Sequence, residues 1–387
     1  MAEIRTYSLL KQFILGFIIS VLLLETLFRI YYFLGERKLL GLSPARTTLI
    51  WVDDEKVGRK LAPNQRGLFV SPRKEYITSI ETNSEGFRDV EHRIEKGEGK
   101  KRVIILGDSF VENFQVSLQK TFFRQLAENL KEENVEIIAL GLGNTGSAQE
   151  YFLLREWGLK YKPDVVVQLF LTANDVRNNL EELNKISYLP YLEIDSSGKV
   201  TEIKPVRQTS ISTKIKEVLK NLRFVEFLLG VRQNLLERTP NKNLGYPLDY
   251  HIYDENYSKD FERAWELTKK IILETKRLTE ENGGTYVLVI LANNEQVNSG
   301  VWEEITKTYP EITKTEIDLE KPDKLLRKFC EVEKLFCHFL LPYFKDYVAS
   351  NPDKKTHFRY DGHLNETGTN LLANFLTETL EGYFSIK

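Results

Sequence analysis

A serine in this chain stands where a nucleophile is expected. Ser109 follows the apolar run 103–106, whose β-branched residues predict a strand buried on both faces, and Gly107 allows a tight turn after it. At such a strand-to-helix junction a hydroxyl is exposed, and free N–H groups of the next helical turn can stabilise an anion beside it. Asp-Ser after a strand is also an ordinary helix N-cap, so this stretch alone leaves both interpretations open.

A histidine and an aspartate near the C-terminus could complete the chemistry. His363 is one of five histidines, and Asp361 lies two residues before it in a polar stretch. A serine nucleophile needs a base with a near-neutral pKa, and a carboxylate improves that base by fixing its tautomer. Both side chains face the same way only if the backbone bends, which Gly362 permits. Alone this stretch predicts a surface turn; together with Ser109 it favours a catalytic triad.

The elements that would position these residues alternate between strands and helices. Apolar runs predict strands at 103–106, 135–140, 163–171 and 285–291, with helical patterns between and after them. The first three strands end in small or polar residues, and ligands bind at that edge of an open parallel sheet. The sequence therefore predicts a three-layer α/β/α sandwich with a central parallel sheet.

Changes in composition divide the chain into three parts. We expect a membrane anchor at 1–38, a lead-in segment packed on the core at 39–100, and the main body at 101–387. The pattern loosens at about 179–282, which we interpret as an insertion or cap over the sheet edge. That stretch contains an expected hairpin at 188–203 and helical segments near 215–236 and 261–281.

The N-terminal segment predicts a single transmembrane helix. An uncharged apolar run at 12–24 continues through Glu25 and Arg29. About 20 helical residues cross a bilayer, so the span must accommodate these two charges, whose i,i+4 spacing lets them pair on one face. A cleaved signal peptide is less favoured because no small-x-small site follows the run. The positive-inside count leans slightly against export of the body.

Composition argues against two classes of protein. A net charge of −2, without a dense basic run, argues against a nucleic-acid binder. The two cysteines, Cys330 and Cys337, supply neither a zinc set nor a disulfide framework, and a single bridge between them is the less favoured arrangement. We expect no metal and no cofactor.

One part of the lead-in is distinctive. Within 81–92, Asn83 and Gly86 favour a turn, and Phe87 could anchor that turn on the body. We expect a surface lead-in to the first core strand rather than a catalytic role.

Four blocks of the sequence resemble those of SGNH/GDSL hydrolases in order and spacing. They are Gly-Asp-Ser-Phe at 107–110, the turn 141–146, Thr-Ala-Asn-Asp at 172–175 and Asp-Gly-His at 361–363. The likeness covers about residues 80–178 and 280–380, and the lead-in and anchor are similar to a membrane-anchored bacterial branch. It implies a flavodoxin-like topology and a body outside the cytoplasm, because family members of this kind are usually exported.

The resemblance implies a role for each matching residue. Ser109 would be the nucleophile, His363 the general base and Asp361 its orienting partner. The oxyanion hole would comprise the backbone N–H of Ser109, a backbone N–H of the second block, where Asn144 aligns best, and the side-chain amide of Asn174. Each such donor lowers the barrier by about 3–4 kcal/mol.

The chain departs from the family pattern at three places. Asn144 stands where the second block has glycine, although Gly143 is adjacent, and Thr172 replaces the glycine of the third block. The position three residues before His363 is Tyr360, so the acid must be Asp361. This two-residue spacing is similar to the Asp-x-His pair of polysaccharide O-acetyltransferase relatives.

These observations predict a serine-dependent acyl-ester hydrolase on a membrane anchor, acting on an ester-bearing small molecule, lipid or glycan. The runner-up is an O-acyltransferase or O-acetylesterase acting on a cell-envelope glycan. A third hypothesis is a catalytically silent, anchored binding module. It predicts a lost or misplaced triad member, which the distance from Ser109 Oγ to the His363 ring tests.

Overall fold

The computed structural model forms two compact units. It describes residues 2–39, 47–71, 73–203, 222–237 and 245–384. The first unit contains residues 1–47 and 207–243, and the second contains 48–206 and 244–387. The start of the helix expected near 215–236 lies outside the described residues.

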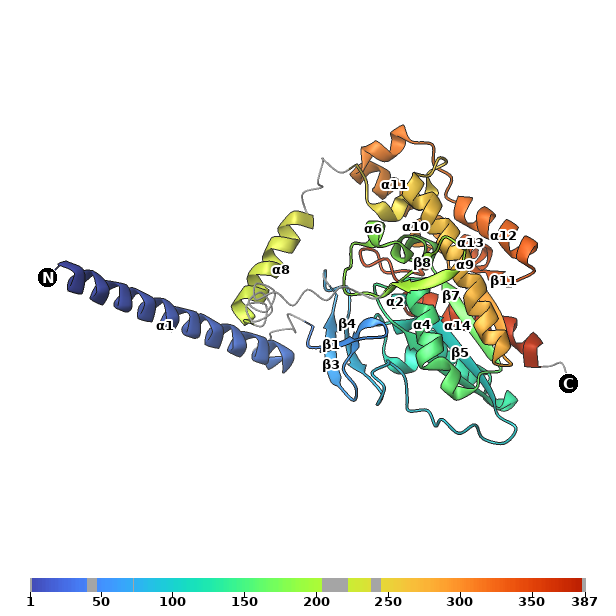
Figure 1. The fold of residues 1–387 in the computed structure, drawn as a ribbon, viewed down its shortest axis with the longest axis horizontal. Helices are drawn as coiled ribbons and strands as arrows, with labels where there is room; N and C mark the ends of the chain where they lie inside the picture. Colours follow the sequence, from blue (N-terminus) through green and yellow to red (C-terminus); the bar gives the residue numbers. More distant parts are fainter. Residues whose placement is uncertain (1, 40–46, 72, 204–221, 238–244, 385–387) are drawn as a thin grey trace. The chain divides into compact units, whose positions relative to one another are not determined.

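The first unit pairs α1 (Ala2–Glu36) with α8 (Arg223–Glu237) (Figure 1). Within α1, Lys11–Glu36 is the one described helix that is long and apolar enough to cross a membrane, with a mean hydropathy of 2.2. A signal sequence would meet the same criterion. The expected charge pair forms within it, because Arg29 Nε lies 2.7 Å from Glu25 Oε1.

A five-stranded parallel sheet lies at the centre of the second unit. Its strands are β5 (Lys101–Gly107), β6 (Val135–Gly141), β7 (Val165–Phe170), β10 (Thr285–Ile290) and β11 (Phe336–Phe339). They lie in the order β11-β10-β7-β5-β6, and each pair is parallel. Counted along the chain, this is the flavodoxin-like order 2-1-3-4-5, in which the connections change direction between β5 and β7. The predicted central parallel sheet is confirmed.

Alternate side chains of β5 supply two separate cores. Ile104 and Leu106 pack in one cluster, whereas Val103 and Ile105 pack in the other, because successive residues of a strand point to opposite faces. Three helices contribute to the first core: α4 (Ser147–Glu156), α9 (Lys259–Glu281) and α12 (Lys321–Glu333). Three contribute to the second: α3 (Phe122–Asn129), α13 (Leu340–Ser350) and α14 (Glu366–Phe384). The three-layer prediction is therefore confirmed.

Short helices connect these elements. They are α2 (Ser109–Glu112), α5 (Thr172–Asp175), α6 (Glu181–Asn184), α10 (Asn294–Val297) and α11 (Ser299–Thr308). Two of them, α2 and α5, follow β5 and β7 directly at the edge where the strands end. The chain therefore turns sharply at the edge where the sequence places its polar residues.

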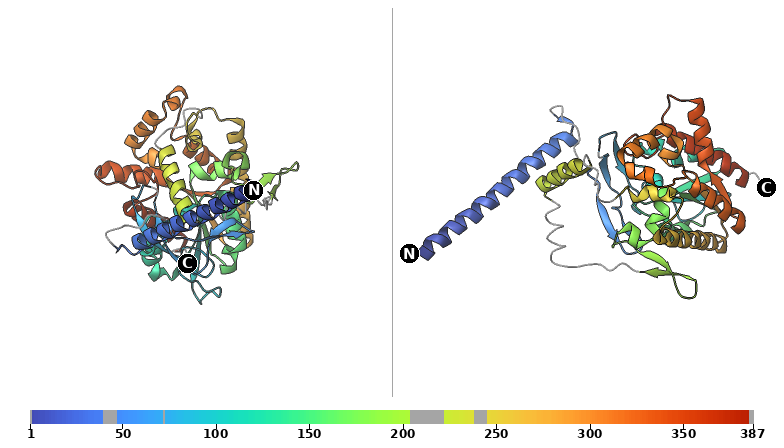
Figure 2. Two further views of the ribbon diagram at one scale, coloured as in Figure 1. Left: turned by 90° about the vertical axis from the view of Figure 1, so that its left-hand side faces the viewer. Right: turned by 90° about the horizontal axis from the view of Figure 1, so that it is seen from above.

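Part of the expected insertion belongs to the core. In α9, Ala264, Ile271 and Ile272 are fully buried, and the helix packs against β10 and α4. The expected hairpin also forms, from β8 (Tyr191–Ile194) and β9 (Val200–Ile203), and its tip extends from the body (Figure 2). The boundaries of the insertion at 179–282 stay a prediction.

The lead-in forms two small antiparallel sheets. Their strands are β1 (Trp51–Asp54) with β2 (Gly58–Leu61), and β3 (Arg66–Val70) with β4 (Ile77–Glu81). Leu61 and Ile80 bury their side chains in a cluster with Phe114, which lies five residues after Ser109. The lead-in therefore packs beside the segment that carries the expected nucleophile.

A disulfide joins Cys330 in α12 to Cys337 in β11. This was the less favoured arrangement, and the expectation was wrong because consecutive elements bring the two Cα atoms within 6.2 Å. β11 is an edge strand, so the bridge ties the edge of the sheet to a helix beside it.

Candidate active site

Ser109 opens α2 immediately after β5. Asp108 caps this helix, because its Oδ1 accepts the backbone N–H of Phe110 at 2.9 Å. Glycine is required at Gly107, where a Cβ would lie 2.4 Å from Cγ2 of Val111. The N-cap and the exposed hydroxyl are therefore compatible: Asp108 supplies the cap and leaves the Ser109 hydroxyl available at the sheet edge.

Ser109, His363 and Asp361 form a hydrogen-bonded row. Ser109 Oγ lies 2.7 Å from His363 Nε2, and His363 Nδ1 lies 2.7 Å from Asp361 Oδ1. Gly362 has a φ of 81°, in the region that favours glycine, so the bend expected between the two side chains forms. Both separations are hydrogen-bond distances. The silent binding module predicts a lost or misplaced triad member, and these distances give no sign of one.

Asp361 and His363 shift the pKa values of one another. Burial alone would lower the pKa of the His363 ring, but the hydrogen bond and the charge of Asp361 raise it above its usual value. Burial alone would raise the pKa of Asp361, but the hydrogen bond and charge of His363, with further hydrogen bonds from Tyr76 and Gln115, lower it. Asp361 is therefore ionised at neutral pH and stabilises a proton on His363.

Of the two asparagines expected in the oxyanion hole, one lines the pocket and the other binds Asp108. Asn144 lines the same pocket as Ser109. Asn174, in α5, donates its Nδ2–H to Asp108 Oδ2 at 2.7 Å and is not among the described residues lining that pocket. A side-chain amide carries two N–H groups, so one donor of Asn174 remains. The structure thus brings Asn144 to the pocket and holds Asn174 on the carboxylate that precedes Ser109.

Glu112 is a pocket residue that the sequence analysis missed. It lies three residues after Ser109, and it is 7% exposed. Burial raises its pKa to about 8, although a hydrogen bond from the Gly143 N–H and the charge of Arg88 act in the opposite direction. The available signal was its i,i+3 spacing, which places it near Ser109 on a helical turn.

A pocket of about 420 Å³ opens beside Ser109. Much of its wall is aromatic: Trp51, Phe69, Tyr76, Phe114 and Tyr188. Three of these rings, together with Arg59, belong to the lead-in, whose weak periodicity gave no sign of a pocket. Cavities of about 640 and 750 Å³ lie near the β8–β9 hairpin and between α9 and α12, and their described linings include neither Ser109 nor His363.

The lead-in also contacts the loop that carries the acid and the base. Tyr76 Oη donates to Asp361 Oδ2 at 2.8 Å, and Gln115 Nε2, from the segment after α2, lies 3.4 Å from Asp361 Oδ1. Glu75 Oε2 accepts the backbone N–H groups of Tyr360 at 3.0 Å and Asp361 at 2.7 Å. Both the wall of the pocket and the support of the acid therefore depend on residues outside the sheet.

Residues 81–92 do not simply lie on the surface as expected, although Phe87 anchors the turn in the core of the body, as predicted. Phe87, Arg88 and Asp89 are all buried. The Arg88 guanidinium donates to three backbone carbonyls after Ser109, those of Glu112, Asn113 and Val116. A buried cation is tolerated here because these carbonyls accept from both terminal nitrogens and the charges of Glu112 and Asp89 lie nearby, although Nε has no partner among the described residues. The segment thus braces the loop that follows the expected nucleophile.

The acidic and histidine side chains of the described residues do not gather into a metal site. In that part of the chain, no group of three or more His, Cys, Asp and Glu side chains could hold a metal ion.

Comparison with known proteins gives similar folds at low identity. No family model and no curated protein matches this chain. It is similar to an acetyl xylan esterase, AlAXEase, to a lipase/acylhydrolase from Enterococcus faecalis, and to a GDSL-like lipase from Bacteroides thetaiotaomicron VPI-5482. The esterase is 14% identical with a TM-score of 0.39, and the match covers 72% of this chain and 99% of the esterase. The lipase/acylhydrolase is 13% identical with a TM-score of 0.36, and the match covers 73% and 96% of the two chains. The GDSL-like lipase is 12% identical with a TM-score of 0.34, and the match covers 74% and 91%.

Proposed function

We propose that this chain is a serine-dependent acyl-ester hydrolase of the SGNH/GDSL family. The observation that carries the proposal is the hydrogen-bonded row from Ser109 through His363 to Asp361, whose members all line one pocket. The row lies where β5 ends, beside the switch point of a doubly wound sheet, and ligands bind there in such folds. The four sequence blocks support the same assignment.

The reaction starts with proton transfer within the row. Ser109 Oγ attacks the ester carbonyl carbon while its proton passes to His363 Nε2, and the carbonyl π electrons move onto the oxygen. Asp361 stabilises the resulting imidazolium through Nδ1–H. When the tetrahedral intermediate collapses, the alcohol leaves with the proton from His363 and an acyl-Ser109 ester remains. Water, deprotonated by His363, then releases the acid and restores the serine.

The charge that develops on the carbonyl oxygen needs donors near Ser109. We assign this role to the backbone N–H groups of Ser109 and Asn144 and to the free N–H of Asn174. Asn144 supports the assignment because it lines the pocket, and Asn174 because its amide is held at 2.7 Å on Asp108. Such donors act most strongly when they are already in place before the charge forms.

Burst kinetics would test this function. The full-length protein, in detergent micelles, should release p-nitrophenol from p-nitrophenyl acetate in a burst that matches the enzyme concentration. The burst should disappear in Ser109→Ala and His363→Ala, because neither variant can form the acyl-enzyme. A burst that persists in Ser109→Ala, or a folded protein inactive on short and long acyl esters alike, would contradict the proposal. Slow turnover that accelerates with an added sugar acceptor would redirect it to acyl transfer.

We also propose that α1 is a single membrane span and that the body lies outside the cytoplasm. The length and hydropathy of Lys11–Glu36 support the span. The disulfide between Cys330 and Cys337 supports export, because such bonds persist in oxidising compartments. These are the two cysteines of the chain, so maleimide labelling of protein from intact cells should require prior reduction. Labelling without reduction, with protease access only after permeabilisation, would place the body in the cytoplasm.

A further inference from the structure

One cation among the residues lining the pocket has no partner. Arg59, in β2, is exposed and lines the pocket that contains Ser109 and His363. Within the described part of the chain, its guanidinium forms no hydrogen bond or ion pair. Asp53 lies opposite Arg59 in the β1–β2 register, but the two side chains form no ion pair within 4.0 Å. The positive charge of Arg59 is therefore available to a ligand.

The acidic groups of the pocket do not offset that charge. Asp361 is committed to His363 at 2.7 Å. Glu112 is buried, and its pKa of about 8 leaves it largely neutral at pH 7. Among the described residues that line the pocket, Arg59 thus remains the uncompensated charge. An anionic group is the ligand chemistry that such a site attracts.

The strand register directs Arg59 toward the pocket. Trp51 is paired with Leu61 and Asp53 with Arg59, and directly paired residues of antiparallel strands share a face. Leu61 buries that face against Phe114, which also lines the pocket. Trp51 and Arg59 therefore line the same cavity. Tyr188, 43% exposed, adds a second ring on which a planar or cyclic group can lie.

We propose that this pocket selects esters whose alcohol part carries a carboxylate, which Arg59 binds while Trp51 and Tyr188 contact the ring or chain between the carboxylate and the ester. A guanidinium suits this role because its paired N–H groups match the two oxygens of a carboxylate. This selectivity rests on the proposed hydrolase function and adds the substrate class to it.

A matched pair of acetate esters tests the selectivity. 4-Acetoxybenzoate carries the carboxylate, and 4-acetoxybenzamide replaces it with a neutral group of similar size. The quantity to measure is the ratio of their kcat/KM values with the full-length protein. Comparing this ratio between enzyme variants cancels the intrinsic reactivity of the two esters. Arg59→Gln should lower the ratio about fivefold, the scale of one exposed ion pair, and Arg59→Lys should restore part of it.

Two further variants sharpen the result. Asp53→Asn removes the nearby negative charge and should keep or raise the ratio. Arg66→Gln, which removes an exposed lead-in arginine paired with Glu81, should leave it unchanged. An identical ratio in wild type and Arg59→Gln, with hydrolysis that still depends on Ser109, would overturn the selectivity alone. Absence of Ser109-dependent hydrolysis of either ester would overturn the proposed function and the selectivity with it.

A different observation concerns the acid of the triad. Tyr76 Oη donates to Asp361 Oδ2, the oxygen that His363 does not use, at 2.8 Å. The Tyr76 ring packs on Phe358, five residues before His363, with centroids 4.7 Å apart. Tyr76 therefore contacts both the carboxylate and the loop that carries it. We infer that Tyr76 is a positioning residue that holds Asp361 toward His363.

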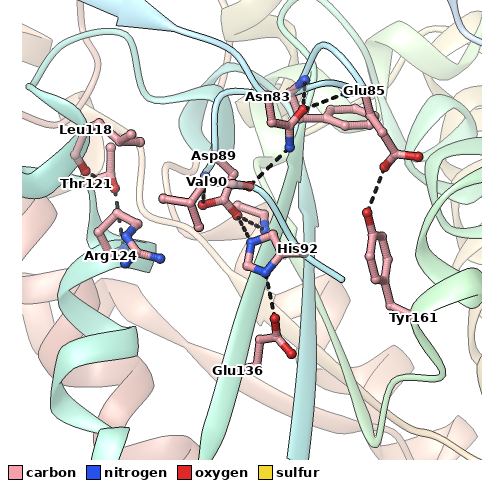
Figure 3. Close-up of polar contacts among 12 residues, drawn as sticks. Asn83, Glu85, Asp89, Val90, His92, Leu118, Thr121, Arg124, Glu136 and Tyr161 are labelled. Atoms are coloured by element: carbon pink, nitrogen blue, oxygen red, sulfur yellow. Dashed lines mark hydrogen bonds and ion pairs between the residues drawn. The ribbon is translucent and has the colours of Figure 1, made fainter. Parts of the chain in front are cut away.

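Tyr76→Phe removes the hydroxyl and keeps the ring, so it separates positioning from wall contacts. With the hydroxyl removed, Asp361 is held less firmly toward His363 and stabilises the protonated ring less, so the acid limb of the kcat/KM profile should move to lower pH. kcat should fall about fivefold, the scale of one hydrogen bond, with little change in KM. Tyr161→Phe is the matched control. It also removes a tyrosine hydroxyl that donates to a carboxylate, that of Glu85 at 2.9 Å, but neither residue belongs to the row of Ser109, His363 and Asp361 (Figure 3).

The outcomes separate this role from the proposed function. If Tyr76→Phe and Tyr161→Phe both reproduce the wild-type pH profile and kcat while Ser109→Ala is inactive, the positioning role is wrong and the hydrolase assignment stands. A changed KM with an unmoved acid limb would make Tyr76 a wall residue only, which also overturns the role.

Discussion

Two of the histidines that contact carboxylates, His363 and His92, differ in their surroundings: the first lies beside a hydroxyl in a pocket, and the second does not. His363 has Asp361 on Nδ1 and a serine hydroxyl on Nε2. His92 has Glu136 on Nδ1 at 2.9 Å and Asp89 on Nε2 at 3.1 Å (Figure 3). For both rings, burial alone would lower the pKa, and the carboxylate partners raise it. What differs is the group on the second nitrogen.

The second partner decides what each histidine can do. Carboxylates occupy both nitrogens of His92 and raise its pKa, and its side chain is only 5% exposed, so neither nitrogen faces a substrate. Its partners bind the sheet instead: Asp89 accepts the Ala139 N–H of β6 at 2.9 Å, and Glu136 pairs with Arg102. A histidine–carboxylate contact is therefore a structural clamp in one place and, as we propose, a catalytic pair in the other.

Removing the His363 ring should give the largest effect. His363→Ala leaves Ser109 without a base, so kcat should fall by about a thousandfold or more, because general bases contribute roughly 10²–10⁴ and triad members act as a unit. The melting temperature should change little, since the ring borders a pocket. Kinetics with p-nitrophenyl acetate and a thermal melt measure the two quantities. Unchanged kcat with a strongly lowered melting temperature would make His363 a clamp like His92.

The corresponding change at the clamp should have the opposite signature. His92→Ala leaves the buried Asp89 and the Glu136 carboxylate without the ring, and breaking a buried ion pair on one side costs about 3 kcal/mol or more of unfolding free energy. kcat should stay within about twofold, because His92 binds β6 and not the pocket. Urea unfolding of the full-length protein, followed by tryptophan fluorescence, measures the loss. A stable variant with reduced kcat would refute the division of roles.

The two regions also differ in how far the sequence predicts them. The run from Val103 to Leu106 is buried on both sides, so its apolar character alone predicts a central strand. Ser109, Asp361 and His363 follow from local motifs, and the parallel sheet brings the segments together. A motif predicts residue types at an edge, whereas it does not predict that Asn174 would be held by Asp108.

The lead-in was harder to predict because its contacts are distant in sequence. Tyr76 lies 285 positions from Asp361, and no local pattern around Tyr76, which precedes β4, predicts that partner. Arg88 was missed for a second reason: a charged residue in a glycine-containing turn is normally solvated, and its burial depends on carbonyl groups from another segment. The clamp at His92 depends in the same way on Glu136, which lies in β6, 44 positions after His92 in the sequence.

A rise in pH should increase the activity of the pocket and decrease the stability that the clamp contributes. Activity needs neutral His363, so kcat/KM should rise as pH increases through its raised pKa, above the usual value of about 6.5. The clamp needs charged His92: its contribution is complete below about pH 6.5 and is lost as pH rises through the raised folded pKa, a loss of about 1–2 kcal/mol. Unfolding free energies of wild type and His92→Gln between about pH 5.5 and 8.5 isolate the second effect.

The outcomes of that titration are distinct. Wild type should lose its advantage over His92→Gln as pH rises, while the kcat/KM profiles of the two proteins keep the same acid limb. Parallel stability curves across the range would show that His92 is neutral in the folded protein, contrary to the two-carboxylate clamp. An acid limb that moves in His92→Gln would show that the regions are coupled.

The smallest expected effect concerns Glu112, the carboxyl that lies in the pocket without a histidine partner. Burial raises its pKa to about 8, so it is largely neutral at pH 7 and gains its charge as pH rises through 8. That charge would oppose the oxyanion forming beside Ser109, so above the acid limb set by His363, wild-type kcat/KM should fall several-fold as pH rises toward about 9. Glu112→Gln keeps a carbonyl oxygen to accept the Gly143 N–H and cannot ionise, so its kcat/KM should stay level above that acid limb. At the clamp, burial alone would raise the pKa of Glu136, but the hydrogen bonds and charges of His92 and Arg102 lower it, so Glu136→Gln should keep the wild-type alkaline fall. If the fall persists in Glu112→Gln, another group titrates there, and the neutral carboxyl would no longer distinguish the pocket from the clamp.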